Sequence, residues 1–350
     1  MFRRKPPVQP TRSRIMAHKL SRRRFISITA SAAGLGLLPA GAATKGGVQT
    51  VTWEGQALGA SASLTIYHHD RATAELLVKQ AVVEVARLER IFSLYRADSA
   101  LSELNRMGAL ATPPPELVAL LEKSRVVWEL SGGAFDPTVQ PLWTLLASHF
   151  GGTNPDPAGP SEAQLREFLD LVGFGNVLFS EDRIAFARRG MALTLNGIAQ
   201  GFITDRIVDM LRRGGVTKSL VDMGEIRAIG SRPDGGPWKV GVERAPGEAG
   251  LFAILEIEDN AVATSSPDGF RFNDTSRFSH LIDPRSGLGA SLYRGVTVLA
   301  PDATTADAFS TAFSLLQPDA VRRIVAEWPG LRARLLENSA SGQLVEFGRG

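Results

Sequence analysis

Apolar residues recur along much of this 350-residue chain at the three- and four-residue spacing of an amphipathic helix. The longest such pattern covers residues 71–95 and predicts a helix with Leu76, Leu77, Val83, Leu88, Ile91 and Phe92 on its inner face. Shorter helices are predicted over residues 99–106, 116–130, 161–172, 304–316 and 318–328, and another runs from a turn at 197–201 to residue 213.

Strands are predicted between the helices, where short runs are rich in β-branched and aromatic residues. One or two cover residues 50–67, a hairpin at 176–186 turns at Glu181 and Asp182, and a single strand covers 219–229. Further strands are expected at 238–243, 251–257, 295–300 and twice within 331–347, while residues 263–266 open a polar loop. Because helices and strands come in irregular order, with hairpins among the strands, the expected fold class is α+β and not a doubly wound sheet.

The net charge of +3 is unevenly distributed along the chain. Residues 1–43 contain seven Arg, two Lys and no acidic residue, which leaves 30 basic and 36 acidic side chains in the remainder, a net charge of −6. The basic character therefore belongs to the N-terminal segment. The rest of the chain lacks the positive charge that nucleic-acid binding requires, so no nucleic-acid partner is expected.

The N-terminal segment has the features of an export signal. Residues 21–26 read Ser-Arg-Arg-Arg-Phe-Ile, a twin-arginine pattern, and a mildly apolar run leads to the small residues of 40–43. We interpret residues 1–43 as a twin-arginine signal peptide and residues 44–350 as the mature domain. This interpretation predicts a periplasmic protein that uses the twin-arginine export machinery. The apolar run is too short to span a bilayer, so no stable membrane anchor is expected after cleavage.

Two polar side chains share one face of the helix predicted over residues 304–316. Asp307 and Thr311 are four residues apart and follow a strand-like run at 295–300. A carboxylate and a hydroxyl presented together are hard oxygen ligands suited to Mg²⁺. An ordinary solvated helix face with a Ser/Thr-rich first turn accounts for the same residues, so the pair alone leaves both interpretations open.

Two loops carry further candidate groups. Gly197 and Gly201 flank a predicted helix start, where free backbone N–H groups favour a phosphate, although small residues there also serve helix packing. His280, close to Asp283, is either a general base or a structural histidine.

Several other chemistries lack the residues they need. The absence of cysteine excludes disulfides, thiolate metal sites, a cysteine nucleophile and an N-terminal lipid-modified cysteine. The five histidines show no HxxxH or HExxH zinc spacing, and neither a GxSxG elbow nor a Walker A lysine loop is present.

Six segments, in their order and spacing, resemble the FAD:protein FMN transferase family, the ApbE family, over about residues 55–316. The segments are residues 57–60, 93–99, 132–137, 196–201, 279–287 and 306–311. The resemblance implies a compact ApbE-like fold of one or two lobes, in which mixed sheets are flanked by helices.

Members of this family split FAD and transfer FMN through its phosphate to a Ser or Thr hydroxyl of a partner flavoprotein, releasing AMP. The resemblance implies that Asp307, Thr311 and the backbone carbonyl of Gly197 hold Mg²⁺, and that His280 deprotonates the acceptor hydroxyl. It implies flavin or adenosine contacts at Leu58, Tyr95, Ala134, Phe135, Asp136 and Leu281.

Positions 194 and 200 also touch the flavin nucleotide in the family, and this chain has Thr194 in place of the usual Asp and Gln200 in place of Lys or Glu. Residues 223–225 read Met-Gly-Glu where Gly-Gly-Asp is more usual. These replacements bear on FAD binding and keep open the alternative of a non-catalytic FAD-binding protein. A separate alternative is an FAD pyrophosphatase that releases FMN and AMP.

The expected acceptor is a flavoprotein of a membrane respiratory complex. The twin-arginine segment, without a lipid-modified cysteine, resembles soluble exported members of the family, one of which is associated with nitrous oxide reduction.

Overall fold

A computed structural model describes residues 47–243, 251–273, 277–339 and 342–348. The twin-arginine segment lies outside the described residues, so its interpretation stays a prediction. No helix within the described ranges combines the length and the apolar character needed to cross a membrane.

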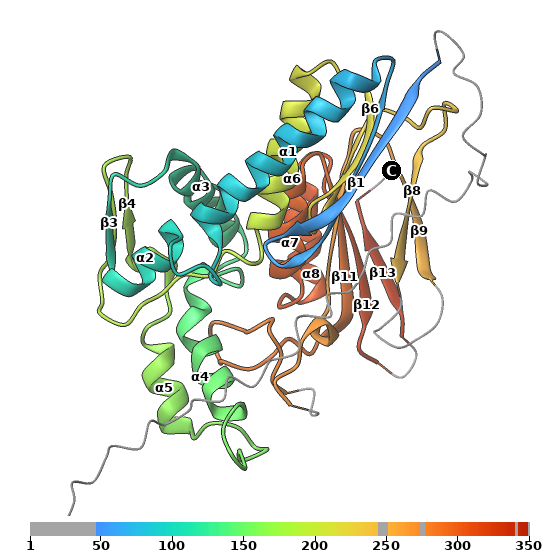
Figure 1. Cartoon of the computed structure of the whole chain (residues 1–350). Coiled ribbons are helices and arrows are strands. Elements are labelled where there is room, and N and C mark those ends of the chain that lie inside the picture. The colour runs from blue at the N-terminus through green and yellow to red at the C-terminus, as the bar shows by residue number, and fades with distance from the viewer. Residues whose placement is uncertain (1–46, 244–250, 274–276, 340–341, 349–350) are drawn as a thin grey trace, which may run out of the picture.

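The largest element is an eight-stranded sheet that spans one side of the molecule (Figure 1). Its strands in spatial order are β1 (Gln49–Ala57), β2 (Ala60–His68), β6 (Lys218–Asp222), β7 (Ile226–Ile229), β10 (Ala261–Ser265), β11 (Tyr293–Ala300), β12 (Arg332–Glu337) and β13 (Leu344–Phe347). Every pairing among the described strands is antiparallel, so these sheets are not mixed in strand direction as the resemblance had implied.

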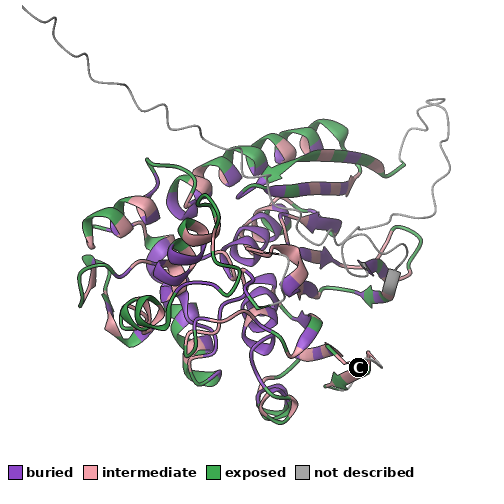
Figure 2. Ribbon diagram, turned by 90° about the horizontal axis from the view of Figure 1, so that it is seen from below, coloured by how far each residue is buried: buried purple, intermediate pink, exposed green. Residues whose placement is uncertain are grey.

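Alternate residues of the central strands point to opposite faces of this sheet, and both faces are buried. Val221, Ala261 and Ala263 face the main hydrophobic core, whereas Leu220 and Val262 belong to a second cluster. The second cluster is closed by the hairpin of β8 (Trp238–Glu243) and β9 (Leu251–Ile257). The main core is covered by α1 (Arg71–Phe92), α6 (Ala199–Arg213), α7 (Ala303–Phe313) and α8 (Pro318–Glu327). Figure 2 shows that buried residues are concentrated between these layers.

The remaining elements lie beside the helical layer (Figure 1). A small sheet in the order β3 (Ala109–Ala111), β5 (Arg183–Phe186), β4 (Val177–Phe179) accompanies α2 (Ala100–Met107) and α3 (Pro115–Leu130). Next to them are α4 (Gln140–Phe150), α5 (Glu162–Leu169) and the short 3₁₀ turns η1 (Pro137–Val139), η2 (Phe174–Asn176) and η3 (Pro267–Gly269). Leu142, Leu146, Phe278 and Ile282 form a third, smaller cluster here.

The structure confirms the α+β class and most predicted elements, with four differences. Residues 219–229 are two strands, β6 and β7, because the chain reverses at Gly224, whose φ of +105° suits glycine. Residues 263–265 continue β10 instead of opening a loop, and α4 and β3 were not predicted. On α1, Leu76 and Val83 are exposed, because the buried stripe runs through Leu77 and the small residues Ala74 and Ala81.

Candidate functional site

The N-terminal end of α6 lies against the middle of α7. The N–H of Gly201 donates a hydrogen bond to Oδ2 of Asp307, with an N–O distance of 3.0 Å. One turn earlier, Gly197 faces Thr311 so closely that a Cβ on Gly197 would lie 2.8 Å from the hydroxyl oxygen. Asp307 and Thr311 are one turn apart on α7. The fold therefore brings together the three residues predicted to hold Mg²⁺.

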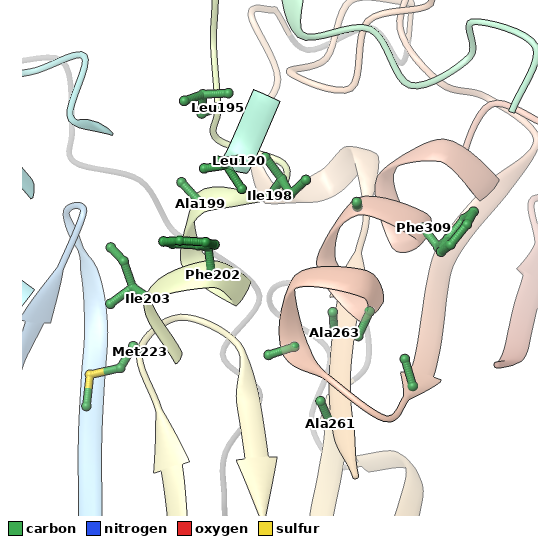
Figure 3. Packing of buried hydrophobic residues seen from close by; sticks show 14 of the residues in the cluster. Leu120, Leu195, Ile198, Ala199, Phe202, Ile203, Met223, Ala261, Ala263 and Phe309 are labelled. Atoms are coloured by element: carbon green, nitrogen blue, oxygen red, sulfur yellow. The ribbon is translucent and has the colours of Figure 1, made fainter. Parts of the chain in front are cut away.

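Close approach of the two helices depends on glycine. A Cβ on Gly201 would lie 2.2 Å from the carbonyl oxygen of Ala303, which is far inside van der Waals contact. Around this contact, Ile198, Ala199 and Phe202 pack into the main core (Figure 3). The glycines at the start of α6 thus let the backbone of one helix reach the carboxylate of the other.

Burial raises the pKa values of the carboxyl groups near this contact. Burial raises the pKa of Asp307 to about 7, although the Gly201 N–H lowers it. Burial, followed by the negative charges of Asp307 and Asp222, raises the pKa of Glu225 well above its usual range. Buried carboxyl groups that disfavour their own charge attract a proton or a cation.

Two buried polar atoms at this place have no hydrogen-bond partner among the described residues: Oε2 of Glu225 and Nε2 of Gln200. A free carboxylate oxygen suits a cation, and a free amide N–H suits a phosphate oxygen. Together with the carboxylate of Asp307, the hydroxyl of Thr311 and the carbonyl of Gly197, the Glu225 carboxylate makes a hard-oxygen environment that fits Mg²⁺.

A metal ion here would depend on that mixed set of donors. Nowhere in the described ranges do three or more His, Cys, Asp or Glu side chains gather closely enough to hold a metal ion. Mg²⁺ retains several waters in protein sites and is commonly bound through one or two carboxylates, so a cluster of three is not required.

His280 is a half-buried residue beside η3, with buried neighbours on both sides in the chain. Its Nδ1 is 3.1 Å from the carbonyl oxygen of Phe270, and because a carbonyl only accepts, this nitrogen carries the hydrogen. In the neutral imidazole, the other ring nitrogen, Nε2, then carries the lone pair that can accept a proton. Arg285 forms a bidentate salt bridge with Asp283, in which Nε and Oδ1 are 2.9 Å apart. The position of Asp283 is therefore explained without His280.

The residues expected to contact flavin or adenosine fall into two groups. Leu58, Ala134, Phe135 and Leu281 are buried in the main hydrophobic core, the same cluster that holds the start of α6. Tyr95 follows the end of α1 and is 59% exposed. The first group is thus buried and the second is open to solvent, and the contact roles of both groups stay predictions.

The carboxylate of Asp136 is engaged by the protein itself. It accepts hydrogen bonds from the N–H and hydroxyl of Thr138, from Nε1 of Trp128 at 3.2 Å and from the N–H of Phe174 at 3.0 Å. These contacts join α3, η1 and η2 at the residue that follows Ala134 and Phe135 in the chain. The carboxylate therefore holds this loop, whatever the backbone beside it binds.

The two replaced positions have different surroundings. Thr194 donates its N–H to the carbonyl of Pro137 at 2.8 Å, which ties the loop before α6 to η1. Gln200 is buried against the β6–β7 turn, where a Cβ on Gly224 would lie 2.3 Å from the amide nitrogen. The replacement at position 200 and the Met-Gly-Glu turn therefore contact each other.

Asp222 and Glu225 are acidic groups of the site that the sequence did not identify as site residues, although Glu225 belongs to the Met-Gly-Glu replacement. Burial raises the pKa of Asp222 to about 6, and its Oδ1 accepts the N–H of Gly224 at 2.9 Å. Interpreting 219–229 as one strand hid both residues, because a turn was not expected there. The glycine at position 224 was the available signal.

Comparison with known proteins identifies the family of this chain. The model of the ApbE family matches residues 58–335. An FAD:protein FMN transferase of Treponema pallidum is 32% identical over 70% of this chain and 72% of its own length. One from Haemophilus influenzae is 28% identical over 77% and 81%.

Solved structures give the same result. The apo crystal structure of the Pseudomonas stutzeri flavinyl transferase ApbE has a TM-score of 0.74 at 26% identity, covering 86% of this chain and 95% of that one. The ApbE protein of Thermotoga maritima has a TM-score of 0.73 at 27% identity, covering 85% and 97%.

Proposed function

Since this chain belongs to the ApbE family, we propose that it is an FAD:protein FMN transferase, which moves FMN from FAD to an acceptor protein. The observation that carries the proposal is the contact between α6 and α7. There a buried carboxylate, a hydroxyl and a glycine backbone converge beside a helix N-terminus. This combination suits a nucleotide pyrophosphate with its metal ion.

We propose that Asp307, Thr311 and the carbonyl of Gly197 hold Mg²⁺ during the reaction. Bound there, the ion would neutralise charge on the pyrophosphate, which is the main requirement of phosphoryl-type transfer. The N-terminal end of α6, where the Gly201 N–H meets Asp307, lies at the same place, and the positive end of the helix dipole favours phosphate charge. The Gln200 amide, buried without a partner among the described residues, offers one more donor.

In the proposed transfer, His280 acts as the general base. With its hydrogen on Nδ1 directed at Phe270, the ring accepts the proton of an acceptor Ser or Thr hydroxyl through Nε2. The hydroxyl oxygen forms a bond to the FMN phosphorus, the bond between that phosphorus and the AMP phosphate oxygen breaks, and AMP leaves. A positioned base contributes roughly 10²–10⁴-fold to such a step.

The sequence of residues 21–43 supports a proposal about location. We place the mature chain in the periplasm after twin-arginine export, where its acceptor would be a flavoprotein of a membrane respiratory complex, as in the nitrous-oxide-associated members.

Incubation of purified residues 44–350 with FAD, Mg²⁺ and a candidate acceptor tests the function. The expected result is flavin fluorescence that remains on the acceptor in a denaturing gel, together with one AMP per flavin attached. An acceptor with its target Ser or Thr changed to Ala serves as the control and should stay dark. AMP release without any acceptor would instead favour an FAD pyrophosphatase, and FAD binding without AMP would favour a non-catalytic protein.

A further inference from the structure

Asp205 lies within α6, one turn beyond Gly201, and is not among the residues expected to touch metal or flavin. Its carboxylate accepts the backbone N–H of Ala303 at 2.8 Å and that of Thr304 at 2.8 Å, and the hydroxyl of Thr304 also donates to it. Ala303 and Thr304 begin α7. A side chain of one helix therefore caps the N-terminus of the other.

This cap comes in addition to the one that α7 supplies for itself. The first N–H groups of a helix have no partner within the helix, and the residue before it usually satisfies one of them. Asp302 does so here, accepting the N–H and the hydroxyl of Thr305, both at 2.9 Å. The second carboxylate, from Asp205, is thus not needed merely to start α7.

The carboxylate of Asp205 also forms an ion pair with the large sheet. Arg227 of β7 donates to Oδ1 of Asp205 at 2.6 Å, and both side chains are close to buried, with 11% and 13% of their surfaces exposed. Removing one partner of a buried ion pair leaves the other charge uncompensated, so each side chain restrains the position of the other. Asp205 therefore joins α6, α7 and the large sheet at one point.

Three contacts follow one another along the antiparallel pair of helices. They join Gly197 with Thr311, Gly201 with Asp307, and Asp205 with Ala303 and Thr304. Each contact is about one helical turn from the next along both segments, 197–205 and 303–311, so all three lie where the two helices face each other. The first two contacts contain the proposed Mg²⁺ ligands. In the third, a carboxylate of α6 binds the first backbone N–H groups of α7.

We propose that Asp205 is a positioning residue that sets the register of α7 against α6 and thereby the affinity of the cation site, without touching the cation. This rests on the proposed function, since it assumes that Asp307 and Thr311 bind the ion. A slip of α7 along α6 would separate Asp307 from Gly201 and Thr311 from Gly197 together. Residues that orient ligands from outside the ligand shell typically change metal affinity by about 10–100-fold.

The test compares Asp205→Ala with Asp302→Ala in the purified mature chain. Both remove a carboxylate that caps α7, but only Asp205 reaches across from α6. Binding of Mn²⁺ alone is measured by electron paramagnetic resonance, with Mg²⁺ as competitor, and the unfolding temperature is recorded without metal. We expect both variants to unfold at lower temperature, Asp205→Ala to bind Mn²⁺ about 10–100-fold more weakly, and Asp302→Ala to stay within about threefold of wild type.

A milder matched pair covers the case in which Asp205→Ala does not fold. Thr304→Val removes one hydrogen bond to Asp205, and Thr305→Val removes the equivalent bond to Asp302. We expect weaker Mn²⁺ binding only for Thr304→Val. Equal Mn²⁺ affinities within either folded pair would overturn the positioning role.

A reference variant separates this proposal from the proposed function. If wild type binds Mn²⁺ no better than Asp307→Asn, the metal site is wrong and the role of Asp205 is wrong with it. If wild type binds better than Asp307→Asn while the matched pairs behave alike, only the role of Asp205 is wrong.

Discussion

The contact between α6 and α7 and the segment around His280 are built in opposite ways. The helix contact lies in the main core, and its polar groups meet at fixed points such as Gly201 with Asp307. His280 is half-buried and held by the backbone of Phe270, next to an edge-to-face pair in which the ring centroids of Phe270 and Phe272 lie 5.1 Å apart. A site that must hold charge needs exact register, whereas a base that meets a protein substrate needs access.

This difference separates the expected effects of substitution. Changes in the helix contact should alter stability and metal binding together. Changes at His280 should lower the rate of transfer while the fold and the metal site persist, because its half-buried ring bonds to the Phe270 carbonyl on a segment apart from α6 and α7. The predictions below test that separation, beginning with the largest effect.

Asp307→Asn should lower the rate of flavin transfer by about 10³-fold, since a metal contributes several kcal/mol of charge stabilisation. Without metal, the same variant should unfold at a higher temperature than wild type, because it removes a charge that burial disfavours. Gel fluorescence and thermal unfolding measure the two effects. A less stable variant with normal Mn²⁺ binding would show that Asp307 is structural.

His280→Ala should lower the transfer rate on the order of 10²-fold and leave the unfolding temperature and Mn²⁺ affinity near wild type. His149→Ala is the matched control, because His149 is also half-buried and its Nε2 lies 2.9 Å from a backbone carbonyl, that of Asp156. It should transfer flavin normally. Similar losses in both variants would contradict a proton-accepting role for His280.

Gly201→Ala should weaken Mn²⁺ binding about tenfold and destabilise the fold by about 1–3 kcal/mol, because its Cβ would press on Ala303 and push the helices apart. Gly295→Ala is a suitable control, since a Cβ there would meet nothing within 4 Å. Denaturant unfolding and Mn²⁺ titration measure both quantities. If stability falls but Mn²⁺ affinity does not, the helix spacing does not govern the site.

Asp222→Asn should change the pH dependence of stability in the metal-free protein. Burial raises the folded-state pKa of Asp222 to about 6, so between about pH 4 and pH 6 the folded state holds a proton that the unfolded state has lost. The stabilisation is complete below about pH 4 and is lost as the pH rises through 6, at roughly 1.4 kcal/mol per pKa unit. Urea unfolding at several pH values should show a flatter profile for the variant, and coinciding slopes would disprove the shift.

Sequence pattern predicted most of the fold because each helix and strand carries its own signal. The helix over 304–316 was recognised from apolar spacing, and α7 occupies Ala303–Phe313. Errors occurred where tertiary contacts decide the local conformation. The buried stripe of α1 runs through Ala74, Leu77 and Ala81, whereas the larger Leu76 and Val83 are exposed, because packing against the neighbouring elements decides which face of the helix is covered.

The site, like the fold, has features that the sequence indicates and features that only the structure shows. Residue type and order were enough to identify Asp307, Thr311, Gly197 and His280 as candidates and to indicate the ApbE family, since hard oxygen ligands and an imidazole are recognisable by their chemistry. Only the tertiary structure shows that Gly201 contacts Asp307, that Glu225 is buried beside them, and that Asp205 caps α7 from another helix. Such contacts join residues about a hundred positions apart, and their distances follow from how α6 and α7 pack, which no local pattern encodes.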